Sequence, residues 1–223
     1  MNSEKTSNEF CQTLGTAGMS ALTTPDKNTA YIKFLSRLLP KSGKVLDCAC
    51  GYGRLTIPLA QKGFAIEGVD IAENLIADAK NFAAKASLAI KFTIGDMRAL
   101  PYQDNSFAYV LCMWSSFNHL LTQHDQLTAL REMLRVTQPT GTILLDLPCP
   151  KEALKELQQH ATAIDQEQRV FKNMIADVEN TTYFHDKQSI KALLDQIDTC
   201  TYELKMQAIG MRRIRFIVEI IKK

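Results

Sequence analysis

Residues 45–54, Val-Leu-Asp-Cys-Ala-Cys-Gly-Tyr-Gly-Arg, decide the fold of this chain. The apolar start predicts a short strand that runs into Asp47, and a helix is predicted to begin at Arg54. The loop between them is built from small residues, among them Ala49, Gly51 and Gly53. Such residues let a ligand lie against the backbone, and glycine tolerates positive φ. The unpaired N–H groups of the helix N-terminus suit a carboxylate or phosphate, so the loop predicts a nucleotide-like ligand.

Strand and helix patterns alternate five times around this loop. Strands are predicted over 44–48, 64–69, 90–94, 107–113 and 142–147, and helices over 25–39, 54–62, 72–85 and 125–136. This alternation predicts a parallel sheet with helices on both faces. Further on, we expect a helix over 151–160, an extra strand over 170–178 and a helix over 189–197. Residues 202–209 and 213–220 read as a closing hairpin that turns around Gly210.

Length and composition favour a single domain over residues 1–223. Hydrophobic residues make up 46% of the chain and charged residues 22%, the balance of a globular domain. Residues 1–20 show no clear period and are expected to be loosely ordered, and 148–185 form the expected variable region. The net charge of +2 is too small to indicate nucleic acid or an anionic membrane as a partner. We expect the basic cluster Arg212, Arg213 and Arg215 to lie on a solvated surface.

The cysteines and histidines indicate no metal site. Several of the six cysteines lie in apolar segments, which suits buried free thiols in a reducing compartment. Cys48 and Cys50 lack a second pair at zinc spacing, and His119 and His124 are off the spacing of one helical face. No apolar run approaches the ~20 residues that span a bilayer, and the N-terminus lacks a signal-peptide pattern. We therefore expect a cytoplasmic protein with no membrane contact.

Three acidic residues end the first three predicted strands: Asp47, Asp70 and Asp96. In an open α/β sheet the ligand lies at these carboxyl ends. Asp70 could accept hydrogen bonds from two ribose hydroxyls, Asp96 could accept one from an adenine amino group, and Asp47 could orient the loop or attract a cation. A carboxylate at Asp47 would repel the pyrophosphate of a dinucleotide. The loop also lacks the third glycine of a dinucleotide fingerprint, since Thr56 stands in its place.

Four ordered motifs together resemble the class I S-adenosylmethionine-dependent methyltransferases. These are Val45–Arg54, Gly68–Ile71, Gly95–Met97 with Leu100-Pro101, and Leu130–Val136 through Gly141. The resemblance implies a doubly wound α/β fold whose seven-stranded, mostly parallel sheet has an antiparallel C-terminal strand. It also implies S-adenosylmethionine as cofactor. The residues it implies for cofactor binding are Tyr31, Asp47, Ala49, Gly51, Gly53, Arg54, Asp70, Ile71, Asp96, Met97 and Met113. Ala49 departs from the family pattern, because a glycine is usual there.

Residues after the fourth strand are candidates for the acceptor side of the site. His119 is the titratable side chain there that suits neutral pH, so we take it as a candidate general base, with packing as the alternative. Asn118 could hydrogen-bond the acceptor or a neighbouring loop. Tyr31 could close over the methionine part of the cofactor or belong to the core. Arg54 could meet the cofactor carboxylate or be exposed. The variable region, with Phe171, Tyr183, Phe184 and His185, is expected to set specificity.

The sequence predicts transfer of a methyl group to a small-molecule acceptor. It lacks the Asn-Pro-Pro-Tyr type motif of enzymes that methylate nucleic-acid amino groups, and Met113-Trp114-Ser115-Ser116 stands there instead. It also lacks a strongly basic face, so no nucleic-acid partner is expected. A protein or tRNA substrate, and a non-catalytic protein that binds S-adenosylmethionine as a partner or regulator, stay open as alternatives. A nicotinamide-dependent dehydrogenase is the weaker third reading. The oligomeric state is not predicted.

Overall fold

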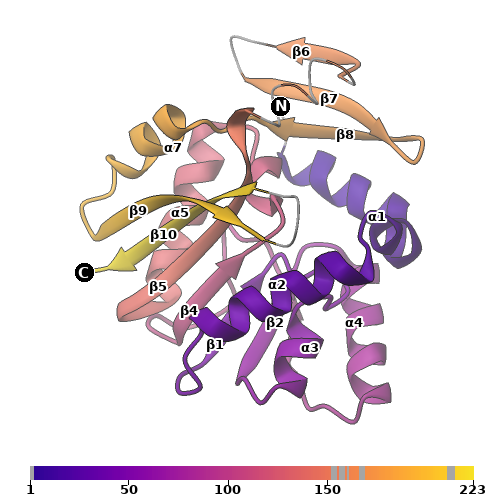
Figure 1. Ribbon diagram of the computed structural model, residues 1–223, viewed down its shortest axis with the longest axis vertical. Coiled ribbons are helices and arrows are strands. Elements are labelled where there is room, and N and C mark those ends of the chain that lie inside the picture. Colours follow the sequence, from indigo (N-terminus) through magenta and orange to yellow (C-terminus); the bar gives the residue numbers. More distant parts are fainter. Residues whose placement is uncertain (1–2, 152–154, 156–158, 160, 166–168, 210–213) are drawn as a thin grey trace.

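The computed structural model describes residues 3–151, 155, 159, 161–165, 169–209 and 214–223. A seven-stranded sheet in the order β3-β2-β1-β4-β5-β10-β9 forms the centre of the molecule (Figure 1). Its strands are β1 (Val45–Cys48), β2 (Ile66–Asp70), β3 (Phe92–Ile94), β4 (Phe107–Cys112), β5 (Thr137–Pro148), β9 (Cys200–Ala208) and β10 (Ile214–Lys222). Strands β1 to β5 pair in parallel, and β10 pairs antiparallel with both β5 and β9. The predicted fold class, including the closing antiparallel strand, is confirmed.

Helices cover both faces of this sheet, as the alternation predicted. Helices α2 (Pro25–Leu38), α3 (Thr56–Gln61) and α4 (Glu73–Lys85) pack on one face. Helices α5 (Gln123–Val136) and α7 (Lys187–Leu194) pack on the other. Successive side chains along a central strand point to opposite faces, so Leu144 of β5 is buried toward α2 and Leu145 toward α5. Apolar side chains are therefore buried on both sides of the central strands, which explains their continuous apolar runs.

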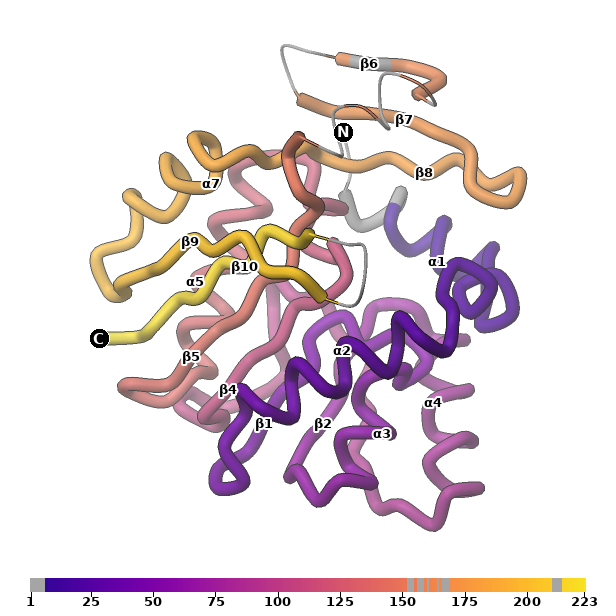
Figure 2. Tube along the Cα trace, in the orientation of Figure 1, coloured from indigo at the N-terminus to yellow at the C-terminus, as the bar shows by residue number. Residues whose placement is uncertain are grey.

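Helix α1 corrects the expectation of a loosely ordered N-terminus. It covers Ser3–Ala21 and is kinked at Gly15, whose backbone has φ 56° and ψ −173°. Phe10 and Leu14 are buried, and the helix contacts α4 and β8 (Val178–Tyr183). Figure 2 shows α1 lying between α4 and this strand. The glycine interrupts the 3.6-residue period, because helical spacing is lost at the kink, and this accounts for the missing sequence signal.

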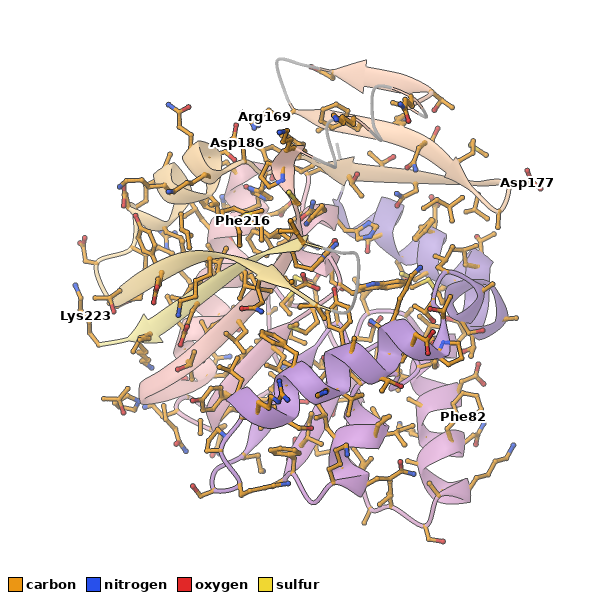
Figure 3. The ribbon with its side chains drawn as sticks, in the orientation of Figure 1. Phe82, Arg169, Asp177, Asp186, Phe216 and Lys223 are labelled. Carbon is orange, nitrogen blue, oxygen red and sulfur yellow. The ribbon has the colours of Figure 1, made fainter. Side chains whose placement is uncertain are left out.

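A second, three-stranded antiparallel sheet corrects the single extra strand expected over 170–178. It has the order β6-β7-β8, with β6 at Ala163–Asp165 and β7 at Val170–Ile175. Strands β7 and β8 form a hairpin whose two turn residues, Ala176 and Asp177, both have positive φ. The tip at Asp177 projects away from the main sheet in Figure 3. An ion pair of 2.8 Å between Arg169 and Asp186, both labelled there, ties the start of the hairpin to the N-cap of α7.

The remaining predictions divide between confirmed and untested ones. All six cysteines are free thiols and five of them are buried, as expected. Much of the helix predicted over 151–160, and the turn around Gly210, lie outside the described residues. In the part of the chain that the structure describes, no helix is both long and apolar enough to cross a membrane.

Candidate functional site

A cavity of about 750 Å³ opens where β1, β2 and β4 end and is bordered on its far side by α1, β7 and β8. It brings together most of the predicted site residues: Asp47, Ala49, Gly51, Arg54, Asp70, Ile71, Asp96, Met97, Met113 and His119. Tyr31 and Gly53 are not among the residues that line it. The volume is that of a small-molecule site, and its position at the carboxyl ends of parallel strands is the usual one for this sheet type.

Asp70 holds the loop after β1 in place. Its Oδ2 accepts a hydrogen bond of 2.7 Å from the Gly51 backbone N–H, and its Oδ1 accepts one of 2.9 Å from that of Ala72. Burial raises the pKa of this carboxyl, while the backbone N–H groups of Ala72, Gly51 and Ile71 oppose the rise. Since each carboxylate oxygen can accept a second bond, Asp70 keeps capacity for ligand hydroxyls.

Gly51 leaves the cavity open where a side chain would fill it. Its φ is +54°, and a Cβ built on it would meet no atom nearer than Leu75 Cδ1 at 3.9 Å. Gly53 differs, because a Cβ there would lie 3.1 Å or less from Ile57 and Phe92. Gly51 therefore keeps space for a ligand, whereas Gly53 allows the helix and sheet to pack closely. The predicted role of Gly53 in binding stays a prediction.

Ala49 adopts a backbone conformation that favours glycine. Its φ is +63°, in the left-handed region. A residue with a Cβ is destabilised there by roughly 1–2 kcal/mol relative to glycine. The departure from the family's glycine is thus a source of local strain rather than a matter of size alone.

Asp47 is a buried carboxyl at the floor of the cavity. Its Oδ2 accepts a hydrogen bond of 2.6 Å from the Thr56 hydroxyl. Burial raises the pKa of Asp47 to about 6, while the Thr56 bond and the charge of Arg54 oppose the rise. This bond ties the end of β1 to the first residue of α3, and the expected role of Asp47 in orienting the loop stays a prediction.

Asp96 is paired with an arginine that the sequence reading did not identify. The guanidinium of Arg98 donates to both carboxylate oxygens, with Nη2 lying 2.6 Å from Oδ2, and it also contacts Asp125. Asp96 and Arg98 both line the cavity. The close spacing of Asp96 and Arg98 was the available signal, since a carboxylate and a guanidinium two residues apart in a loop can pair bidentately.

A buried network centred on Asp146 supports the cavity from behind. Its carboxylate accepts hydrogen bonds of 2.8 Å from the Tyr31 hydroxyl and from the Trp114 backbone N–H. Arg215 Nε lies 2.5 Å from its Oδ1 and Arg215 Nη2 donates to the Ser115 hydroxyl. Arg215 is therefore buried rather than solvated, which corrects the expectation for this member of the basic cluster. Arg212 and Arg213 lie outside the described residues.

Strand register explains this ion pair. Asp146 stands opposite Ile217 in the antiparallel pairing of β5 with β10, so Arg215 is its diagonal neighbour on the same face. Tyr31 of α2 packs on that face and meets the same carboxylate. The predicted contact of Tyr31 with the cofactor stays a prediction, because the hydroxyl is bound to Asp146 and the ring is buried.

The loop after β4 has an unusual backbone that the Asp146 network holds. Trp114 and Ser115 have φ of 59° and 68°, both in the left-handed region. The side chain of Asp146 binds the N–H of Trp114, and its backbone carbonyl accepts from the N–H of Ser115. The Arg54 guanidinium lies 4.4 Å from the Trp114 ring centroid. Two consecutive residues in this conformation are characteristic of functional loops whose surroundings fix them.

His119 links the end of the 3-10 helix η1 (Ser116–His119) to α1 and β8. Its ring stacks on Phe10 with centroids 5.7 Å apart, and it hydrogen-bonds the backbone of Thr181. Burial lowers the pKa of His119 to about 4, so the imidazole is neutral at pH 7. These contacts favour packing over the general-base role that the sequence offered as one reading.

Most residues on the far side of the cavity were not predicted from the sequence. Helix α1 contributes Phe10 and Cys11, and the small sheet contributes residues of β7 and β8. Of the residues expected to set specificity, Tyr183 and Phe184 line the cavity, whereas Phe171 and His185 do not. These elements lack a clear sequence pattern, because the helical period of α1 is interrupted at its kink and the strands of the small sheet are short.

Comparison with known proteins gives consistent matches. Residues 45–141 match the family described as "Methyltransferase domain". YqeM of Bacillus subtilis is 34% identical over 117 residues, which is 52% of this chain and 47% of that protein. The chain spans about half the length of the curated relatives it matches.

Two solved structures resemble nearly the whole chain. The PH0226 protein of Pyrococcus horikoshii has a TM-score of 0.73 and 28% identity, over 87% of this chain and 91% of that one. The magnesium protoporphyrin IX methyltransferase of Synechocystis, solved with bound S-adenosylmethionine, has a TM-score of 0.65 and 15% identity over 100% and 98% of the chains. The latter likeness concerns the fold alone.

Proposed function

We propose that this chain, which belongs to the class I S-adenosylmethionine-dependent methyltransferases, transfers a methyl group from that cofactor to a small-molecule acceptor. The observation that carries the proposal is the extent of the cavity, which has a volume of about 750 Å³. One half adjoins Gly51 and Asp70, and the same cavity continues to α1, β7 and β8. A pocket that extends beyond its cofactor end leaves room for a second molecule.

The residues on the cofactor side fit S-adenosylmethionine. Gly51 leaves open the space that a Cβ would fill, and Asp70 has unused acceptor capacity for the ribose hydroxyls. Asp96 and the Met97 backbone border the position proposed for the adenine, and Arg54 borders that of the carboxylate. When bound, the cofactor would supply a methyl group on a sulfonium, which is a good methyl donor because a neutral thioether is left behind.

The contribution of the protein is chiefly positioning. Holding a nucleophile in line with the methyl group removes much of the entropic barrier to the reaction. Met113 and Trp114 line the cavity, and the Asp146 carboxylate binds the backbone N–H of Trp114. Enclosure by α1 and β8 would keep water from the reacting atoms.

A transfer assay tests the proposal. Radiolabelled S-adenosylmethionine is incubated with the protein and a fractionated metabolite extract, and labelled product is separated from unreacted cofactor. Calorimetry measures cofactor binding in parallel. The proposal predicts both binding and a labelled small molecule. Binding without product in any fraction would instead favour a non-catalytic partner or regulator, and label in protein or tRNA would contradict the small-acceptor assignment.

A further inference from the structure

We infer, resting on the proposed function, that the methyl acceptor is an uncharged, weakly basic amine whose N–H group is held by the side-chain amides of Asn118 and Asn180. Both residues line the cavity, and they are 4% and 8% exposed. Asn118 belongs to η1 and Asn180 to β8, two elements that contact each other. The two residues therefore line the cavity from neighbouring elements.

The amide oxygens of both residues lack partners. Oδ1 of Asn118 and Oδ1 of Asn180 are buried without a hydrogen bond in the described part of the chain. The Asn180 amide is oriented, because its Nδ2 donates to Asn173 Oδ1 at 2.9 Å. A carbonyl oxygen only accepts, and leaving a buried one unpaired is unfavourable. A ligand that brings N–H donors to these oxygens would remove that penalty.

The part of the cavity lined by α1, η1, β7 and β8 carries no formal charge at pH 7. This holds for every described lining residue of α1, η1, β7 and β8, including the neutral His119. Arg215, at the edge of the cavity, is paired with Asp146. A charged ligand would lose its hydration here without gaining a counter-ion. The acceptor that fits is therefore uncharged.

The titratable groups that line this part of the cavity do not supply an effective base at pH 7, because the His119 imidazole is only weakly basic and the Cys11 thiol and Tyr183 hydroxyl stay protonated. Burial lowers the pKa of His119 to about 4 and raises the pKa of Cys11 to about 12. Burial also raises the pKa of the Tyr183 hydroxyl. An alcohol would need a base to remove its proton, whereas a neutral amine has a free lone pair. Nitrogen thus suits this site better than oxygen.

Methyl transfer to an uncharged amine does not require a base from the protein. The lone pair of the acceptor nitrogen forms a bond to the methyl carbon while the carbon–sulfur bond breaks, and that electron pair stays on sulfur. The methylated nitrogen carries a positive charge until its proton passes to water. Asn118 and Asn180 orient the nitrogen through its N–H groups and take no proton themselves.

The test uses four matched probes: aniline, phenol, benzoate and benzylamine. Their binding to the complex with S-adenosylhomocysteine is measured by ligand-detected NMR, so the result does not depend on turnover. Aniline should bind, and the two charged probes should bind at least about tenfold more weakly. Phenol is followed by mass spectrometry with S-adenosylmethionine. Equal or tighter binding of a charged probe, no binding of aniline, or methylation of phenol but not aniline would overturn the inference.

Matched variants assign the effect to the two amides. Asn118→Leu and Asn180→Leu should each weaken aniline binding about fivefold to tenfold, the scale of one hydrogen bond. Asn8→Leu is the control, because Asn8 Oδ1 is likewise buried and unpartnered but Asn8 does not line the cavity. Asn118→Asp keeps the size and should shift preference toward benzylamine. Unchanged aniline binding in both Leu variants would contradict the inference.

The proposed function fails separately from this inference. If the protein does not bind S-adenosylmethionine, or transfers no methyl group to any acceptor, the proposed function is wrong whatever the probes do. If it transfers methyl groups but to charged or hydroxyl acceptors, only the inference about the acceptor is wrong.

Discussion

Removing the carboxylate of Asp146 should destabilise the protein more than removing its partner. The side chain is fully buried and Arg215 is 7% exposed, so Asp146→Leu leaves a buried guanidinium without a counter-ion. Breaking a buried pair from one side typically lowers the free energy of unfolding by about 3–5 kcal/mol. The same change leaves the Tyr31 hydroxyl and the Trp114 N–H without their acceptor.

The partner variants make this prediction quantitative. Arg215→Met leaves Asp146 with two hydrogen-bond donors, so we expect a smaller loss of about 1–3 kcal/mol. The double variant removes both charges, and we expect it to be at least about 2 kcal/mol more stable than Asp146→Leu alone. Urea denaturation at pH 7 measures all three. A loss below about 1 kcal/mol in Asp146→Leu, or simple additivity in the double variant, would refute this reasoning.

Three further predictions concern residues of the cavity. Ala49→Gly should raise the free energy of unfolding by up to about 1 kcal/mol, because it relieves a φ of +63°, and a lower melting temperature would contradict this. The pKa of Asp47 is about 6 in the folded protein against an ordinary 3.8, so the folded state favours the protonated carboxyl. The resulting contribution to the free energy of unfolding is fully present below about pH 4 and is lost as pH rises through 6. Asp47→Asn should therefore be more stable than the parent by up to about 3 kcal/mol at pH 8, a gain that vanishes near pH 4 in denaturation curves. His119→Gln should leave the shape of the pH–rate profile between pH 6 and 8 unchanged, because the pKa of His119 is about 4. If the variant instead lost a pH-dependent limb of the profile in that range, His119 would be the general base.

The main sheet could be predicted because its signals are local and repeated. Continuous apolar strands such as 107–113, small-residue loops and capped helices recur in order. The start of α2 illustrates this, since Thr24 caps Lys27 N and Pro25 takes the first helical position. Each of these features depends on neighbouring residues only.

The parts that could not be predicted depend on distant contacts or unusual backbone. The β7–β8 hairpin turns at Ala176 and Asp177, both with positive φ, whereas such turns ordinarily show asparagine or glycine. The pairing of Asp146 with Arg215 joins residues 69 positions apart. One signal was available, because a carboxylate inside the apolar run 142–147 requires a buried partner.

Calorimetric titration with S-adenosylmethionine tests the central claim most directly. The parent protein should bind the cofactor, and Asp70→Ala should weaken binding by at least about 1–3 kcal/mol, the scale of hydroxyls left without a charged acceptor. Gly51→Val should abolish binding, because its side chain would occupy the open space and its φ of +54° disfavours a branched residue. Circular dichroism verifies that both variants stay folded. Folded variants that bind as tightly as the parent would contradict the assignment of this cavity to the cofactor.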